Sequence, residues 1–204
     1  MIVNSHNDWD PLEEIIVGRA DHSRISTDIS ARSFSYANFN KEDVEKLEGP
    51  YPQWVIDEAN EDADGLADAL KKMDIKVHRP KVIDWEQKNY DIGQGWQSKG
   101  WYSWCPRDLI LPLGDMLIET PTPVRARYFE TKLYEDIMYE AFEDGALWMS
   151  APKPKLHDDM YTFEDIENKP TLLNHEICFD APNIVRVGTD LLYQVSNSGN
   201  MKGY

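Results

Sequence analysis

Two stretches of the chain follow one plan, and this repeat limits the folds that the sequence can adopt. The first runs from Trp104 to Glu130 and the second from Glu176 to Asn197. Each has an aspartate shortly after a cysteine, followed by an apolar segment, a glycine and a second apolar segment. Two apolar segments joined at a glycine predict a β-hairpin, because glycine readily adopts turn conformations. We therefore expect a protein built from repeated supersecondary units.

The aspartates of the two stretches hold comparable positions. Asp108 stands six residues before Gly114, and Asp180 stands eight residues before Gly188. Each carboxylate is therefore expected at the entrance of its hairpin, and pseudo-symmetric units would turn both toward one common site. Two converging carboxylates suit a planar cation such as a guanidinium, which offers paired donors in a fixed fork.

Helical patterns flank the first hairpin. Before the hairpin, a stripe of apolar residues with helical spacing over 59–73 predicts an amphipathic helix, and a strand is predicted after it over 75–77. After the hairpin the same order returns, with a second apolar stripe at helical spacing over 129–141 and a strand over 146–149. A short buried strand is also predicted over 15–17. The repeated unit is thus a strand or hairpin, a helix and a strand, which makes the fold class α/β. The two stripes are Ala59, Ala63, Leu66, Leu70 and Met73, and Phe129, Leu133, Ile137 and Ala141.

A third unit begins with the hairpin expected over 184–195, but no helix and closing strand follow it before Tyr204. An open array of units would expose an edge. We therefore expect either a fragment of a longer protein or an obligate assembly.

Composition narrows the classes of function. The chain has 204 residues, a net charge of -16 and a pI near 4.6, which disfavours nucleic acid as a partner. Its apolar runs fall short of the roughly 20 residues that span a bilayer, so no membrane segment is expected. Two cysteines and no recognisable leader favour a cytoplasmic protein. The chain has no Cys-x-x-Cys pair, and neither a metal nor a cofactor is expected.

Three features leave alternatives open. The aromatic segment 84–104 is either a lid over a ligand or a loop packed onto the domain. Arg125 and Arg127 alternate as on a strand face, where they either clamp a substrate carboxylate or pair with a glutamate. Cys105 and Cys178 adjoin the key aspartates, yet buried spectator thiols are favoured over nucleophiles.

Five phrases together resemble the N-terminal half of glycine amidinotransferase and its relatives. They are NDWDPLEEIIVG, CPRDLILPLGDMLIETP, VRARYFE, WMSAPKP and EICFDAPNIVRVGTDLLYQVSN, and the resemblance runs from Asn7 to about Asn200. It implies a pentein fold, in which five strand-helix units form a propeller around a central channel. Residues 1–204 would hold about two and a half units of that domain. The remaining units are expected beyond residue 204.

The resemblance also implies an activity. In this family a cysteine thiolate attacks the guanidino carbon of arginine, ornithine leaves, and the amidino group passes to an acceptor amine such as glycine. By resemblance Asp108 binds the substrate guanidinium and Asp180 belongs to the catalytic set. The family's histidine and nucleophilic cysteine have no counterpart here, so they are expected beyond Tyr204 and the chain alone is expected to be inactive. Asn183 stands where family members usually carry a second acid.

Two other functions remain open. One is a half-propeller that binds guanidines without chemistry, and the other is a guanidine-hydrolysing relative of the deiminase type. The expected partners are small molecules, namely arginine and an acceptor amine. A homodimer and a complementing C-terminal half are the alternatives for assembly.

Overall fold

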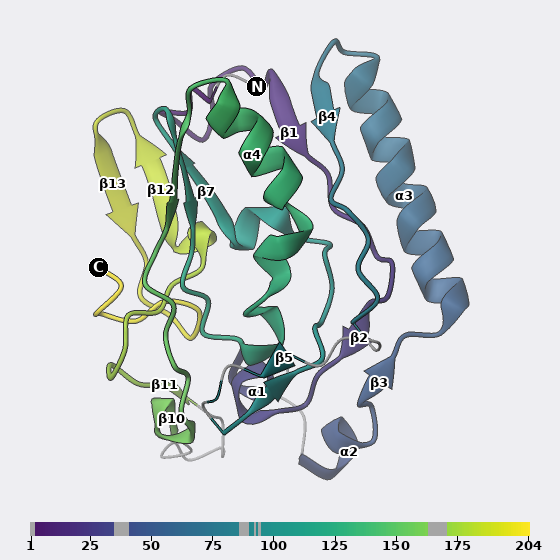
Figure 1. Ribbon diagram of the computed structural model, residues 1–204, viewed down its shortest axis with the longest axis vertical. Helices are drawn as coiled ribbons and strands as arrows, with labels where there is room; N and C mark the ends of the chain where they lie inside the picture. Colours follow the sequence, from purple (N-terminus) through teal and green to yellow (C-terminus); the bar gives the residue numbers. More distant parts are fainter. Residues whose placement is uncertain (1–2, 35–40, 86–89, 92, 94, 163–170) are drawn as a thin grey trace.

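The computed structural model describes residues 3–34, 41–85, 90–91, 93, 95–162 and 171–204. Within this part, strands and two longer helices form an α/β arrangement of successive units (Figure 1). Helix α3 (Gln53–Lys71) lies at one side beside β1 (Glu14–Ile16) and β4 (Lys76–His78). Strands β12 (Ile184–Val187) and β13 (Asp190–Tyr193) lie at the other side.

The first unit consists of β1, α3 and β4. The two strands pair in parallel with Ile15 opposite Val77, and α3 connects them. A parallel pair requires such a crossover. Ala63 and Ala67 of the helix pack with Val17, which directly follows β1. Both strands predicted here are confirmed within one residue.

The predicted stripe of α3 is wrong at two positions. Leu66 is 53% exposed and Met73 is 69% exposed, whereas the buried residues of the helix are Ile56, Ala63 and Ala67. Two small alanines bring the helix close to the strands, and Leu66 lies outside the line that they form. Side-chain size at the contact, rather than hydrophobicity alone, therefore decides which face is buried.

The second unit has the full predicted order. Strands β7 (Ile110–Leu113) and β8 (Met116–Glu119) form a hairpin, and β9 (Leu147–Ser150) pairs in parallel with β8. Gly114 at the hairpin turn has a φ of +59°, a conformation that favours glycine. Helix α4 (Glu135–Glu143) connects β8 to β9 and packs in the main core cluster through Ile137, Met138 and Ala141.

This helix begins later than its stripe suggested. A 3₁₀ turn, η4 (Glu130–Leu133), precedes α4, so Phe129 and Leu133 lie outside the helix. Leu133 is nevertheless 2% exposed and belongs to the same core cluster. The residue pattern therefore predicted the burial of this side chain, although not its backbone conformation.

The third unit is the hairpin of β12 and β13, which turns at Gly188 with a φ of +65°. The N-terminal segment links it to the second unit, since Ser5 bridges to Gly114 and Asn7 bridges to Val187. Arg186 on β12 also pairs with Asp8. The turns of both repeated hairpins are thus fixed to the same short segment.

The polar stretch over 23–53 contains several short elements. Strands β2 (Arg24–Ile25) and β3 (Gly49–Pro50) pair with each other, and α1 (Ile29–Phe34) and α2 (Lys41–Glu45) lie between them. Further two-residue strands pair in the connecting segments. They are β5 (Tyr90–Asp91) with β6 (Gln97–Ser98), and β10 (Tyr161–Thr162) with β11 (Thr171–Leu172).

Three of the four described tryptophans in the aromatic segment favour packing over a lid. Trp85, Trp96 and Trp101 are all at least 91% buried, and each belongs to a different core cluster, whereas Trp104 at the end of the segment is 40% exposed. A Cβ on Gly100 would lie 2.3 Å from the Trp85 ring, so this glycine lets the segment pass directly over the indole. Residues 86–89, 92 and 94 of the segment lie outside the described part.

None of the helices in the described ranges is both long and apolar enough to cross a membrane.

Candidate functional site

Both predicted aspartates lie on short 3₁₀ turns directly before their hairpins. Asp108 ends η2 (Pro106–Asp108) before β7, and Asp180 precedes η6 (Ala181–Asn183) before β12. Each turn contains a proline near its start. Proline restricts the backbone φ angle and lacks an N–H group, and the first N–H groups of such a turn have no acceptor within it. The two turns contact each other, so the repeat places its two acids at adjacent points of the fold.

Asp108 is paired with an arginine of the protein itself. Arg127 ends the 3₁₀ turn η3 (Arg125–Arg127), and its Nη1 donates to Asp108 Oδ2 at 2.5 Å. Its Nε and Nη2 also bind Glu130 in a bidentate pair, at 2.7 and 2.9 Å. Its guanidinium carbon lies 4.9 Å from the ring centre of Tyr102. The Arg127 side chain is fully buried, while Asp108 remains 20% exposed and accessible to a ligand.

Asp180 is buried without such a partner. The residue is 2% exposed, and neither carboxylate oxygen is paired with a cation of the described residues; its polar neighbours include the Thr122 hydroxyl and the backbone N–H of Asn183. Burial raises the pKa of Asp180 to about 7, and the nearby charges of Asp108 and Glu130 add to this increase while Arg127 opposes it. Because Arg127 and Asp108 both act on Asp180, the structure places the two predicted aspartates in one cluster. Their roles in binding and catalysis remain predictions.

Two further charged residues border this cluster and were missed by sequence reasoning. Glu119 ends β8 and accepts hydrogen bonds from Trp148 Nε1 at 3.0 Å and from Ser150 Oγ at 2.6 Å. Lys153 follows β9, and its buried Nζ has no hydrogen-bond partner. The phrases CPRDLILPLGDMLIETP and WMSAPKP contain Glu119 and Lys153, so the resemblance marked these segments without marking the residues.

The two cysteines do not have the environment of a nucleophile. Cys178 is completely buried, and burial raises the pKa of its thiol far above the usual range. Burial also raises the pKa of Cys105, and the negative charge of Asp108 adds to the effect. A thiolate needs the opposite influence. The structure therefore supports the interpretation of both as spectator thiols.

Arg125 and Arg127 do not share a strand face, so that part of the prediction is wrong. Both lie on η3, where tight 3₁₀ geometry turns the two side chains to different surroundings. Arg125 donates to Leu156 O and to Asp158, while Arg127 forms the glutamate pair that the sequence left as the alternative. Both guanidiniums thus serve as internal contacts in this structure.

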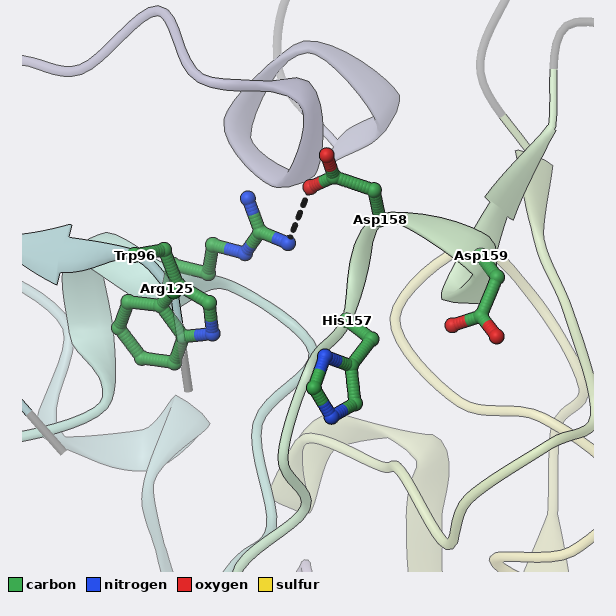
Figure 2. Close-up of a pocket in the computed structure, with 6 residues that line it drawn as sticks. Trp96, Arg125, His157, Asp158 and Asp159 are labelled. Atoms are coloured by element: carbon green, nitrogen blue, oxygen red, sulfur yellow. Dashed lines mark hydrogen bonds and ion pairs between the residues drawn. The ribbon is translucent and has the colours of Figure 1, made fainter. Parts of the chain in front are cut away.

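A hollow of about 560 Å³ lies on the Arg125 side and is separate from the aspartate cluster. Figure 2 shows Arg125 beside Trp96, with its guanidinium paired to Asp158 and with His157 and Asp159 at the wall. The Asp158 side chain, which lines this hollow, is 85% exposed. The guanidinium of Arg125 already donates to Leu156 O and to Asp158. We therefore place the candidate site at the aspartate cluster, where buried groups lack partners.

Asn183, where the resemblance predicts an acid, has structural contacts. Its Nδ2 donates to Gln194 O at 2.7 Å and to Ser196 Oγ at 3.0 Å, and its Oδ1 accepts from the backbone N–H of Asp180 at 3.2 Å. The amide therefore ties the turn that carries Asp180 to the end of β13. A carboxylate in this position has no hydrogen to donate to the Gln194 carbonyl.

Among the residues that the structure describes, no group of three or more histidine, cysteine, aspartate or glutamate side chains is arranged to hold a metal ion.

The fold and the site together define an α/β protein of repeated units with an acidic cluster between two hairpin entrances. No model of a protein family matches the chain. Among curated proteins, it is 42% identical to inosamine-phosphate amidinotransferase 1 of Streptomyces glaucescens over 209 residues, which is 99% of this chain and 58% of that protein. It is 34% identical to the mitochondrial glycine amidinotransferase of Gallus gallus, over 98% of this chain and 50% of that protein.

A solved structure gives the same result. Inosamine-phosphate amidinotransferase StrB1 of Streptomyces griseus superposes with a TM-score of 0.89 at 40% identity, covering 98% of this chain and 57% of that one. The chain belongs to the amidinotransferase family and corresponds to the N-terminal half of its members. It spans about half the length of the curated relatives that it matches. The predicted family and the α/β class are thereby confirmed.

Proposed function

We propose that this chain supplies the guanidine-binding part of an amidinotransferase site, which moves the amidino group of L-arginine to an acceptor amine such as glycine. One observation carries the proposal. The completely buried carboxylate of Asp180 has no cation paired with it among the described residues and lies in the same cluster as the partly exposed carboxylate of Asp108. Such groups are costly unless a ligand completes them, and their placement therefore supports a binding site.

The charges of the cluster favour a cationic ligand. Four carboxylates, those of Asp108, Glu119, Glu130 and Asp180, surround two cations, Arg127 and Lys153. With all six groups ionised, the difference of four and two leaves two negative charges uncompensated. An incoming guanidinium reduces this excess, and its parallel N–H groups match the two oxygens of Asp180.

The chemistry that we propose has two covalent steps. A cysteine thiolate forms a bond to the guanidino carbon, and the carbon–nitrogen bond to ornithine breaks as a proton reaches the leaving nitrogen. The acceptor amine then attacks the amidino-cysteine, loses a proton and releases the thiolate. We assign Asp108 to guanidinium binding and Asp180 to the catalytic set.

The nucleophile and the acid-base histidine are proposed to lie outside this chain, since both described cysteines have raised thiol pKa values. We accordingly propose that the chain alone is inactive. We also propose that it forms about two and a half units of a five-unit pentein propeller, and that a complementing C-terminal half or a homodimer completes the site. A cytoplasmic setting rests on the low cysteine count and remains a proposal.

Calorimetric titration with L-arginine tests the binding part of this proposal. We expect saturable binding to the 204-residue chain, with at least a tenfold loss of affinity for Asp108→Asn and for Asp180→Asn. Two matched controls carry the same substitution at exposed aspartates near the two hairpin turns, Asp115→Asn and Asp190→Asn. Equal affinities in all four variants, or no binding by the unaltered chain, would refute the guanidine site.

Product analysis tests the reaction. Arginine and glycine are incubated with the chain alone, and with a protein that joins it to the C-terminal half of a relative. We expect no ornithine from the first and ornithine with guanidinoacetate from the second. Ornithine from the chain alone contradicts the proposed inactivity, and citrulline from the joined protein favours the hydrolytic alternative over transfer.

A further inference from the structure

The hairpins of the second and third units correspond residue by residue, yet one is covered by a helix and the other is not. Each consists of two four-residue strands that are paired in full across the turn. Leu117 is the second residue of β8, and Leu191 is the second residue of β13. Leu117 is 6% exposed and lies in the core cluster that contains α4, whereas Leu191 is 46% exposed. The third unit therefore leaves uncovered a position that a helix buries in the second.

Helix α4 contacts the first unit as well as its own, because it lies between β7 and β1 (Figure 1). Lys76 Nζ on β4 is 2.9 Å from a carboxylate oxygen of Glu140 on this helix, and His78 Nδ1 is 4.0 Å from the other. The helix of the second unit thus packs against the last strand of the preceding unit. The same relation in the third unit places a helix between β13 and β9, which is the last strand of the second unit.

The outer face of β9 is apolar and uncovered at the matching positions. Strand β9 pairs in parallel with β8 as β4 pairs with β1, so Leu147 takes the place of Lys76. Met149 takes the place of His78. Leu147 is 53% and Met149 is 51% exposed, while Trp148 between them packs against the main core cluster. A helix at this face would meet two apolar side chains where α4 meets a lysine and a histidine.

The exposed leucine of β13 and the exposed residues of β9 belong to faces that meet. Ile118 is paired with Met149 and therefore lies on the same face of its sheet. Tyr193 stands two residues after Leu191 and therefore lies on the same side of β13. Ile118 and Tyr193 pack against one core cluster, so the two faces join there. We call the uncovered side chains beyond this junction the β9–β13 surface, which consists of Leu147, Met149 and Leu191.

The edge of the third hairpin is open in the same way. Strand β8 pairs with β7 on one side and in parallel with β9 on the other. Within the described ranges, β13 pairs with β12 alone. An unpaired edge presents backbone N–H and C=O groups to which a further strand can bind. The third unit therefore offers a face for a helix and an edge for a parallel strand.

We propose that the β9–β13 surface binds a helix-strand segment from the C-terminal half of the amidinotransferase fold. The helix is amphipathic and packs apolar side chains against Leu147, Met149 and Leu191, and the strand pairs in parallel with β13. The inference rests on the proposed function for the source of this segment. This chain matches 58% of one curated relative and 50% of another, so the relatives contain further chain from which such a segment can come.

The contacts of the two longer helices favour this occupant over a second copy of the chain. Helix α3 already packs in the core cluster of the first unit, and α4 packs in that of the second. A second copy therefore has neither of these helices available for the β9–β13 surface unless it unfolds one of its own units.

Methionine oxidation tests the inference without arginine. Dilute hydrogen peroxide is applied to the chain alone and to a protein that joins it to the C-terminal half of the Streptomyces glaucescens relative, and mass spectrometry of peptides locates the sulfoxides. We expect Met149 to react slower by about tenfold or more in the joined protein, because the helix covers it. Met73, which follows α3 and is 69% exposed, should react at the same rate in both. Equal rates for Met149 in the two proteins would overturn the inference.

A second measurement applies if the joined protein does not fold. The two halves are produced as separate chains in one cell, and light scattering after gel filtration gives the mass of their complex. We expect one chain of each half in the complex, with an affinity that falls by about tenfold or more for Leu147→Asp and for Leu191→Asp, because each buries a charge. Leu66→Asp is the matched control, since Leu66 is also 53% exposed but lies on α3, and should leave the affinity unchanged.

Three results of this second measurement contradict the inference: no complex, a complex that Leu147→Asp leaves intact, and a dimer of this chain alone that Leu147→Asp dissociates. Arginine binding is read separately. A complex of the two halves that binds no arginine overturns the proposed function alone, whereas arginine binding with Met149 still uncovered overturns only the β9–β13 surface.

Discussion

The hairpin that follows Asp108 and the hairpin that follows Asp180 have the same plan, but their aspartates differ in environment. Asp108 is 20% exposed and paired with Arg127, whereas Asp180 is 2% exposed and has no ion-pair partner among the described residues. The second unit also carries its helix and third strand, while the third unit presents its hairpin alone in the described residues. Equivalent positions in a repeat have thus acquired different chemistry.

This difference teaches that local sequence places an acid, while the packing around it sets its properties. When two carboxyl groups lie in different environments, their pKa values differ. One site can then hold both a carboxylate that binds a ligand and a carboxyl group that transfers protons. A partly exposed and paired Asp108 suits the first task. A buried Asp180 with a pKa near 7 suits the second.

Arg127→Met should have the largest effect, because it removes the cation on which Asp108 and Glu130 both depend. Two carboxylates would lose their partner in a buried cluster, and we expect a loss of about 3–5 kcal/mol in the free energy of unfolding. Urea unfolding followed by circular dichroism measures it. Arg107→Met is the matched control, since that side chain is 41% exposed and should cost far less. Equal losses in the two variants would show that the cluster is not held by Arg127.

Asp180→Asn should produce a pH-dependent gain in stability. The folded pKa of about 7 lies above the ordinary aspartate pKa of 3.8, so ionisation of Asp180 costs the folded state free energy as pH rises between these values. The asparagine variant avoids this cost. Relative to the unaltered chain, its free energy of unfolding should improve by roughly 2–4 kcal/mol between pH 4 and pH 8. A stability difference that does not change with pH would show that Asp180 is not perturbed.

Asn183→Asp introduces the acid that the sequence resemblance predicts beside Asp180. Two donated hydrogen bonds would be lost, and a carboxylate would face the Gln194 carbonyl, at a cost of about 1–3 kcal/mol at neutral pH. Thermal unfolding measures the change. Asn174→Asp is the control, because Asn174 accepts from the Met201 N–H through an oxygen that aspartate keeps. An unaltered melting temperature would favour a role of Asn183 in acceptor choice over a structural one.

Asp108→Asn should have the smallest effect on stability, near 1 kcal/mol, because Glu130 retains its bidentate pair with Arg127. Urea unfolding beside Asp115→Asn tests this value. A loss as large as that of Arg127→Met would mean that Asp108 is mainly a structural partner, and the distinction between the two aspartates would fail.

Much of the fold could be predicted from local pattern. Apolar segments and glycines that are close in the sequence predict the three described units, each a hairpin or a strand-helix-strand arrangement. They also predict the turns at Gly114 and Gly188 and the two aspartates at the hairpin entrances. The buried face of α3 could not be predicted in the same way. It depends on Ala63 and Ala67 fitting against the strands, which is a property of tertiary packing.

The candidate site was predictable only in its two aspartates. The alternation of Arg125 and Arg127 suggested a strand, but the segment folds as a 3₁₀ turn that sends one side chain to Asp158 and the other to Asp108. Lys153 reaches the cluster across a long sequence separation, so no local pattern indicated it. Contacts between distant segments create the electrostatics of the site, and these required the structure.

The most direct test of the account is the pKa of Asp180 measured by carbon-13 NMR with and without saturating L-arginine. A guanidinium placed against the two carboxylates should lower this pKa by at least about one unit. L-citrulline has a similar shape and a neutral ureido group, so it should leave the pKa nearly unchanged. The same Asp180 pKa with arginine as without it would contradict the claim that Asp108 and Asp180 form one site for a guanidinium.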